Sequence, residues 1–167
     1  MKSKVVLLYS GLFAVIIFAS FEAFSLSGWR IAYERQPHLR CLPIEFTLMQ
    51  ERILKPHEIK IGTLVVFNPV EFSEFYIKDV KILKLVVGIP GDVVSMRAGN
   101  IYVNGDFIGT YKKKSMFQKY DPFMSDLEIT LLDNQYWLSG SSSISVDSRY
   151  IGPVGIQNII GKGYAII

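Results

Sequence analysis

The N-terminal apolar stretch constrains the fold of this chain most strongly. Lys2 and Lys4 precede an apolar run from Val5 to Ala19, and a less pure apolar stretch continues to Leu26. About 20 apolar residues span the hydrocarbon core of a bilayer as a helix, so the extended stretch is long enough. Two lysines precede this stretch, and the next basic residue is Arg30. This distribution of positive charge favours a cytoplasmic N-terminus and export of the rest of the chain.

Two interpretations of this stretch remain open. We interpret residues 1–28 as a membrane anchor, because no convincing small-x-small cleavage site follows the apolar run. The alternative is a cleaved signal peptide, since a charged start followed by about 15 apolar residues is typical of one. In either case residues 29–167 form the exported part, which is long enough for one domain with its own core.

Composition limits the partners of the exported part. The net charge is only +3, and no segment resembles a nucleic-acid-binding motif, so we expect no nucleic acid as a partner. A lipid bilayer is the partner expected for the apolar stretch. Two histidines and one cysteine cannot build an ordinary structural zinc site within one chain. We therefore expect neither a metal nor another cofactor.

Short apolar or alternating runs beyond the anchor predict a mainly β domain. The predicted strands cover residues 63–67, 82–87, 93–96, 101–103, 129–132 and 136–138. Asn104-Gly105 is typical of a type I′ turn, which predicts a hairpin over residues 101–108. Residues from about 106 to 134 have the composition of an inserted loop or small subdomain.

One lysine stands on an apolar predicted strand. Lys84 is followed by Leu-Val-Val and then by the turn Gly-Ile-Pro-Gly-Asp92. Lysine side chains in water titrate near about 10.4, but burial among apolar groups lowers the pKa of a lysine by several units and turns it into a general base. A solvated strand residue ahead of an ordinary turn is the alternative.

Further segments suggest a family when they are taken in order with Lys84. They are Cys41-Leu-Pro43, Gly62-Thr-Leu-Val-Val-Phe67, Tyr136 to Pro153, and Ile159 to Ala165. The set resembles the membrane-bound signal peptidase I family, which uses a serine/lysine dyad. The closest likeness is to its conjugative-transfer branch, the TraF-type pilin-processing peptidases, and it covers residues from about 36 to 165. The box from Ser145 to Pro153 is the most specific part.

The resemblance implies a fold and a function. The fold is a signal-peptidase-type β domain with a small cap insertion over about 106–134, preceded by one transmembrane helix. The implied function is a membrane-anchored peptidase on the periplasmic side, which cleaves an exported pilin precursor in conjugative transfer through an acyl-enzyme. Two alternatives stay open: a general signal peptidase with broad preprotein substrates, and an inactive or Ser-to-Cys form that binds precursors or assembly partners.

The chain departs from the family at the nucleophile. Cys41, its only cysteine, stands where the family has serine ahead of the proline. A lone buried cysteine is usually just a small hydrophobe, but the alignment of Cys-Leu-Pro with Ser-x-Pro implies a catalytic role. Many relatives place a hydroxyl two residues earlier, where this chain has Leu39. The backbone N–H of Cys41 is then the expected oxyanion donor, and His38 or Arg40 is a candidate for the second.

The resemblance also assigns supporting roles. Ser145 and Asp147 correspond to residues that orient the lysine, and Arg149 to one that pairs with the aspartate. The alternative is a serine-rich turn closed by an Asp/Arg pair. The family box begins at Gly140, but serines at 141–143 replace its usual Asp-Asn start.

Cysteine chemistry bears on the outcome of the reaction. An acyl-enzyme at Cys41 is a thioester, and thioesters react with amines far better, relative to water, than oxygen esters do. Cyclisation of a pilin-like substrate is therefore a second possible outcome beside simple cleavage. We further expect edge strands beside Cys41 to bind the substrate in extended form, with Leu42 and Met49 near the bilayer.

Overall fold

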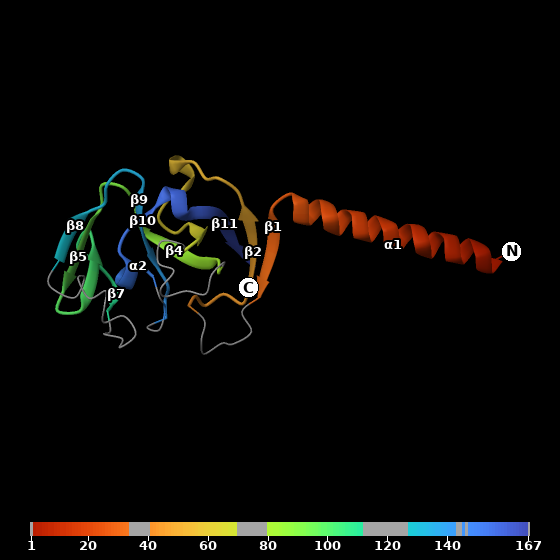
Figure 1. The fold of residues 1–167 in the computed structure, drawn as a ribbon. Helices are drawn as coiled ribbons and strands as arrows, with labels where there is room; N and C mark the ends of the chain where they lie inside the picture. The colour runs from red at the N-terminus through yellow and green to blue at the C-terminus, as the bar shows by residue number, and fades with distance from the viewer. Residues whose placement is uncertain are drawn as a thin grey trace.

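The structure consists of a long N-terminal helix and a domain built from two antiparallel sheets (Figure 1). This computed structural model describes residues 2–33, 41–69, 80–111, 127–142, 145 and 147–166. The helix leaves the domain beside strand β1, and the smaller sheet lies at the opposite end of the molecule (Figure 1).

Helix α1 (Lys2–Leu26) has the properties of a membrane span. Its segment Tyr9–Leu26 is long and apolar enough to cross a bilayer, and none of that segment is buried against the rest of the chain. The predicted apolar helix is therefore present. A signal sequence meets the same criteria of length and composition, so the choice between anchor and cleaved signal stays a prediction.

The larger sheet carries most of the core. Its seven strands lie in the order β1 (Trp29–Tyr33), β2 (Phe46–Glu51), β11 (Ile159–Ala165), β3 (Leu64–Phe67), β4 (Ile82–Gly88), β9 (Gln135–Ser139) and β10 (Val154–Gly155). Short helices η2 (Pro56–Glu58), α2 (Ser148–Ile151) and η5 (Ile156–Asn158) connect or follow these strands. Val65, Phe67, Val86 and Leu138 are fully buried on this sheet. Because β3 and β4 each have a neighbour on both sides, the middle of the sheet is its most rigid part.

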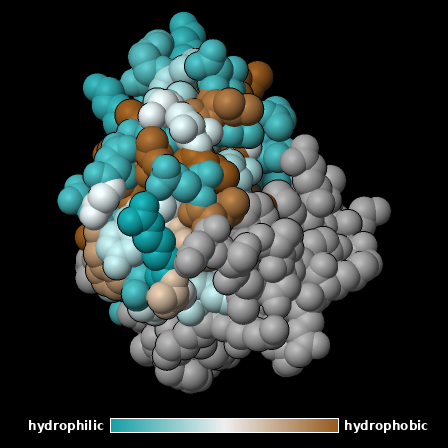
Figure 2. All heavy atoms as spheres, turned by 90° about the vertical axis from the view of Figure 1, so that its left-hand side faces the viewer, coloured by the Kyte–Doolittle hydropathy of each residue, from teal (hydrophilic) through white to brown (hydrophobic). Residues whose placement is uncertain are grey.

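The smaller sheet extends this core at one end. Its strands lie in the order β7 (Asp106–Thr110), β6 (Asn100–Val103), β5 (Val93–Arg97) and β8 (Leu127–Thr130). Val94, Met96 and Ile101 form its buried face and pack with Trp137 of β9, which joins the two sheets. On the coloured part of the end facing away from α1, hydrophilic residues separate small hydrophobic areas (Figure 2).

The prediction of a mainly β domain behind an apolar helix is confirmed. Each predicted strand overlaps an observed one, although β8 begins at Leu127 rather than at residue 129. The predicted type I′ hairpin is also confirmed, since Asn104 and Gly105 have φ angles of 51° and 89°. The Asn104 side chain stabilises this turn by accepting a hydrogen bond from the backbone N–H of Val93 at 2.8 Å.

Four strands were not predicted from the sequence: β1, β2, β10 and β11. In β11 the sequence Ile-Ile-Gly-Lys-Gly-Tyr-Ala does not alternate like a strand, because two of its residues are glycines that pack against neighbouring strands. The predicted cap insertion over 106–134 lies partly outside the described residues. Its described ends, β7 and β8, pair with β6 and β5 in the smaller sheet, and its extent stays a prediction.

A glycine turn fixes the junction between α1 and the sheet. Gly28 has a φ angle of +80°, and a Cβ built on it would lie 2.6 Å from the backbone oxygen of Glu51. The oxygen of Gly28 in turn accepts a hydrogen bond from the N–H of Glu51 at 2.8 Å. The chain can leave the helix and enter β1 along this path only because residue 28 has no side chain.

We expect Gly28→Ala to destabilise the protein more than Gly62→Ala does. Both glycines have positive φ angles, +80° and +84°, but a Cβ at Gly62 would meet nothing within 4 Å. Gly62→Ala should therefore cost about 1–2 kcal/mol from the backbone conformation alone. Gly28→Ala should cost at least about 1 kcal/mol more, because the sheet must also shift. Denaturant unfolding of the full chain in detergent measures both values, and equal losses would contradict this account.

Candidate functional site

Lys84 occupies the middle of the larger sheet. It lies in β4 opposite Val65 of β3, and β9 pairs with the other side of β4 through Leu85 and Val86. The side chain is 1% exposed. Within the described part of the chain, no carboxylate forms an ion pair with it. Lys84 is thus a buried lysine on a strand that is paired on both sides, and its role as a general base stays a prediction.

Cys41 and Lys84 line the same groove. Cys41 is half-buried and is a free thiol. The groove has a volume of about 440 Å³. Its lining consists of Ala32, Tyr33, Cys41, Leu42, Ile44, Glu45, Thr47, Met49, Val80, Lys81, Ile82, Leu83 and Lys84. The fold therefore brings together a thiol and an amine that lie 43 positions apart in the sequence. His38, Leu39 and Arg40 lie outside the described residues.

The loop that follows β9 holds the backbone of Cys41. The carbonyl oxygen of Cys41 accepts hydrogen bonds from the N–H of Ser142 and from the hydroxyl of Ser141, both at 3.3 Å. Ser141 and Ser142 therefore have a definite contact in this chain, which the sequence analysis did not identify.

A buried ion pair organises this loop. The guanidinium of Arg149 donates to both carboxylate oxygens of Asp147 at 2.7 Å, and the two residues are 5% and 0% exposed. Arg149 also donates to the backbone oxygens of Gly140 at 3.1 Å and Ser142 at 2.9 Å. Asp147 accepts a hydrogen bond from the N–H of Gly140 at 2.7 Å. One ion pair therefore fixes both ends of the segment that contacts Cys41.

The pKa of Arg149 reflects its buried position beside Asp147. Burial acts to lower the pKa of the guanidinium, but the hydrogen bonds and the negative charge of Asp147 outweigh burial, so the pKa of Arg149 is raised. A negative charge on Cys41 acts in the same direction. Arg149 is thus coupled electrostatically to the thiol in the groove as well as to its carboxylate partner.

Ser145 is packed against the same loop. Its side chain is 0% exposed, and its hydroxyl has no hydrogen-bond partner within the described part of the chain. A Cβ built on Gly140 would collide with the Ser145 hydroxyl and lie 2.7 Å from the carbonyl oxygen of Cys41. Ser145 and the backbone of Cys41 therefore approach each other at a point that only glycine permits.

Comparison with known proteins identifies the family of this chain. The family model for signal peptidase, peptidase S26, matches residues 3–167. The chain belongs to the S26 signal peptidase family. The S26 assignment confirms the family part of the predicted resemblance, and the likeness to its TraF-type branch stays a prediction.

Curated S26 relatives are similar over part of their length. A protein named probable signal peptidase I-2 from Synechocystis sp. is 30% identical over 105 residues, which are 62% of this chain and 45% of the relative. Signal peptidase I S from Bacillus subtilis is 31% identical over 99 residues, 55% of this chain and 50% of the relative. The chain thus spans about half the length of these relatives. A crystal structure of a signal peptidase I from Enterococcus faecalis has a TM-score of 0.40 and 20% identity, covering 66% of this chain and 97% of that one.

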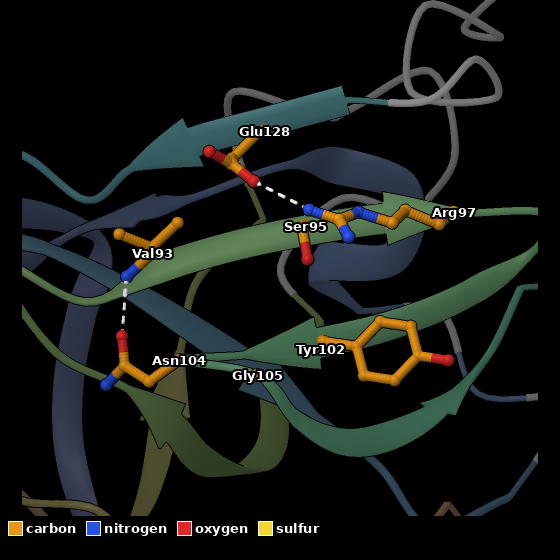
Figure 3. A pocket seen from close by; sticks show the side chains of 7 residues that line it. All are labelled: Val93, Ser95, Arg97, Tyr102, Asn104, Gly105 and Glu128. Atoms are coloured by element: carbon orange, nitrogen blue, oxygen red, sulfur yellow. Dashed lines mark hydrogen bonds and ion pairs between the residues drawn. The ribbon is translucent and has the colours of Figure 1, made fainter.

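A second hollow lies on the outer face of the smaller sheet and shares no lining residue with the Cys41 groove (Figure 3). It has a volume of about 590 Å³ and is lined by Val93, Ser95, Arg97, Tyr102, Asn104, Gly105 and Glu128. Its two charged side chains already neutralise each other, since Arg97 lies 3.1 Å from Glu128 (Figure 3). The lining offers no cysteine, lysine or histidine, so we place the candidate site in the groove of Cys41.

We expect Arg149→Met to destabilise the protein by about 3–5 kcal/mol, because it leaves the buried charge of Asp147 without a partner. Arg97→Met is the matched control, since it breaks an ion pair whose side chains are 69% and 61% exposed. That exposed pair should contribute at most about 1 kcal/mol. Denaturant unfolding followed by circular dichroism measures both. Similar losses for the two variants would show that the Asp147–Arg149 pair does not organise the loop.

Proposed function

We propose that this S26 protein is a membrane-anchored processing peptidase that cleaves an exported pilin precursor through an acyl-enzyme on Cys41. The observation that carries the proposal is that Cys41, a half-buried thiol, and Lys84, a buried amine, line the same groove. The family and the names of its relatives support the peptidase class. The restriction to pilins and to conjugative transfer rests on the resemblance of the Ser145–Pro153 box to TraF-type enzymes.

The proposed reaction has two steps. The Cys41 thiol gives its proton to the Lys84 amine as the sulfur attacks the scissile carbonyl carbon. The C–N bond of the substrate then breaks, and the Lys84 ammonium passes that proton to the departing amine. The result is a thioester between Cys41 and the acyl part of the substrate. A water molecule then attacks the thioester in hydrolysis, and the thiol is released. An amine that attacks in place of water forms a new amide bond.

Supporting residues maintain this arrangement. Ser145 packs beside the Cys41 backbone, and its unpartnered hydroxyl is available to orient the amine of Lys84. Asp147 and Arg149 hold the loop that binds the carbonyl of Cys41. The backbone N–H of Cys41 is the donor proposed for the developing oxyanion.

The apolar helix supports the proposed location. In this proposal α1 is the anchor and its lysines lie on the cytoplasmic side, which puts the β domain on the periplasmic side, where exported precursors emerge. Apolar lining residues of the groove, among them Leu42, Ile44 and Met49, suit an extended segment of a membrane-bound precursor.

A general signal peptidase is the second candidate function. The relatives favour it, because they are named signal peptidase I without reference to pilins. Processing of several unrelated signal-peptide precursors at similar rates would support this candidate over the pilin-specific enzyme. Processing of the pilin precursor alone would support the narrower proposal.

We expect Cys41→Ala and Lys84→Ala each to abolish processing of a pilin precursor by the full chain in proteoliposomes. Removal of the nucleophile or of the proton carrier should lower the rate by at least about 100-fold. Intact-mass spectrometry of the products measures the effect. Gly62→Ala is the control for membrane reconstitution, because it lies outside the groove.

Two other results would overturn the assignment of Cys41. Unchanged processing by Cys41→Ala would place the nucleophile elsewhere. Activity in Cys41→Ser alone, with none in the wild type, would identify this chain as an inactivated serine peptidase that binds precursors without cutting them.

We also expect the thioester to favour an amine over water. A cyclised product has the mass of the linear product less one water, so the same spectra distinguish the two. Cys41→Ser, if it is active, should shift the products toward the linear form, because an oxygen ester discriminates less in favour of amines. Only linear product from active wild-type enzyme would exclude cyclisation.

A further inference from the structure

An ion pair joins the two walls of the Cys41 groove. Lys81 lines the groove directly ahead of β4, and its amine lies 2.6 Å from a carboxylate oxygen of Glu51, the last residue of β2. The two strands are not neighbours, because β11 and β3 lie between them. In a flat sheet, three strand spacings amount to about 14 Å. The pair therefore connects two walls of the groove whose strands are separated by two others in the sheet.

Glycines in β11 allow this approach. In the register of the sheet, Glu51 lies opposite Gly161, Gly161 opposite Val66, and Val66 opposite Leu83. Two residues away along these strands, Met49 of β2 lies opposite Gly163 of β11. Positions 161 and 163 of β11 thus add no side chain to the surface of the sheet beneath the ion pair.

Space above these glycines is already occupied. A Cβ on Gly163 would lie 2.8 Å from a methyl carbon of Leu83 and 2.9 Å from one of Leu64. Met49 and Leu83, which line the groove, each lie two positions along their strands from a member of the ion pair. Side chains two apart on a strand share a face. Met49 therefore shares a face with Glu51, and Leu83 shares one with Lys81. The ion pair thus connects the parts of the two walls that carry these apolar lining residues.

Glu51 also connects to the membrane helix. Its second carboxylate oxygen accepts no hydrogen bond from the residues that the structure describes, and it lies 3.8 Å from the guanidinium of Arg30. Arg30 donates to the hydroxyl of Ser25 in the last turn of α1 at 2.7 Å. The backbone N–H of Glu51 bonds to Gly28 at the junction. One carboxylate thus links the end of the helix to the far wall of the groove.

We propose that Glu51 is a positioning residue that sets the width of the substrate groove through Lys81, and that it ties this groove to the end of α1. The proposal rests on the proposed function, because it takes the groove as the place where an extended precursor binds. Glu51 does not line the groove, so it acts on the substrate only through the spacing of the walls.

Binding of a precursor peptide to the Cys41→Ala form tests the proposal without turnover. The probe is a fluorescein-labelled peptide that spans the processing site of the pilin precursor, and the full chain is held in nanodiscs. We expect Glu51→Gln and Lys81→Met each to raise the Kd about twofold to fivefold, the effect of one partly exposed ion pair. The double variant should be no weaker than either single one, because both changes remove the same interaction.

Salt and matched variants separate a positioning role from a structural one. High salt should raise the Kd of the Cys41→Ala protein toward the value of the variant that also carries Glu51→Gln. The Kd of that second variant should change little with salt, because its ion pair is already absent. Arg97→Gln and Glu128→Gln break an exposed ion pair in the smaller sheet and should leave the Kd unchanged. Lys81→Arg, which keeps the charge, should restore binding. Thermal unfolding of every variant shows whether a change in Kd merely follows a loss of folded protein.

Failure of this inference is distinguishable from failure of the proposed function. Three results would overturn the role of Glu51. They are additive effects on the Kd in the double variant, an unchanged Kd in both single variants, or losses of affinity that only follow losses of thermal stability. If the wild type processes the precursor under those outcomes, the peptidase proposal stands. If the wild type processes nothing while the peptide binds with the expected pattern, Glu51 keeps its role and the peptidase proposal falls.

Discussion

The buried ion pair between Asp147 and Arg149 is the interaction on which the candidate site depends. Neither residue reaches the groove, yet together they bind the backbone on both sides of the loop after β9. That loop in turn holds the carbonyl of Cys41. A buried ion pair of this kind contributes little net stability when compared with an apolar replacement. The pair contributes a defined geometry instead, because a bidentate arginine fixes several backbone groups in one arrangement.

The other half of the site depends on the sheet rather than on the loop. Lys84 is placed by β4, whose neighbours β3 and β9 are paired along its length. Between β2 and β4, strand β11 has glycines at positions 161 and 163, so neither position adds a side chain between the two walls of the groove.

Local sequence patterns predicted a part of this structure. Alternating strands such as β4 and β5, and the Asn104-Gly105 turn, depend on neighbours in sequence, and these predictions were correct. β11 was not predicted, since its glycines serve contacts with β2 and β3 that no local pattern contains. Family resemblance, rather than periodicity, indicated Ser145, Asp147 and Arg149. The contact of Glu51 with Lys81 could not be predicted, because it depends on the register of three intervening strand pairs.

A cysteine at position 41 has a chemical consequence that a serine does not have. The chain has no second cysteine for an internal disulfide, and half-burial in a groove limits contact with other thiols. If Cys41 carries the acyl group, the product depends on which nucleophile reaches the thioester first. A chain end that bears a free amine and is held at the same membrane has a high effective concentration at the groove. The tether of the substrate would then decide between hydrolysis and ring closure, and the Cys41/Lys84 pair would serve both reactions without change.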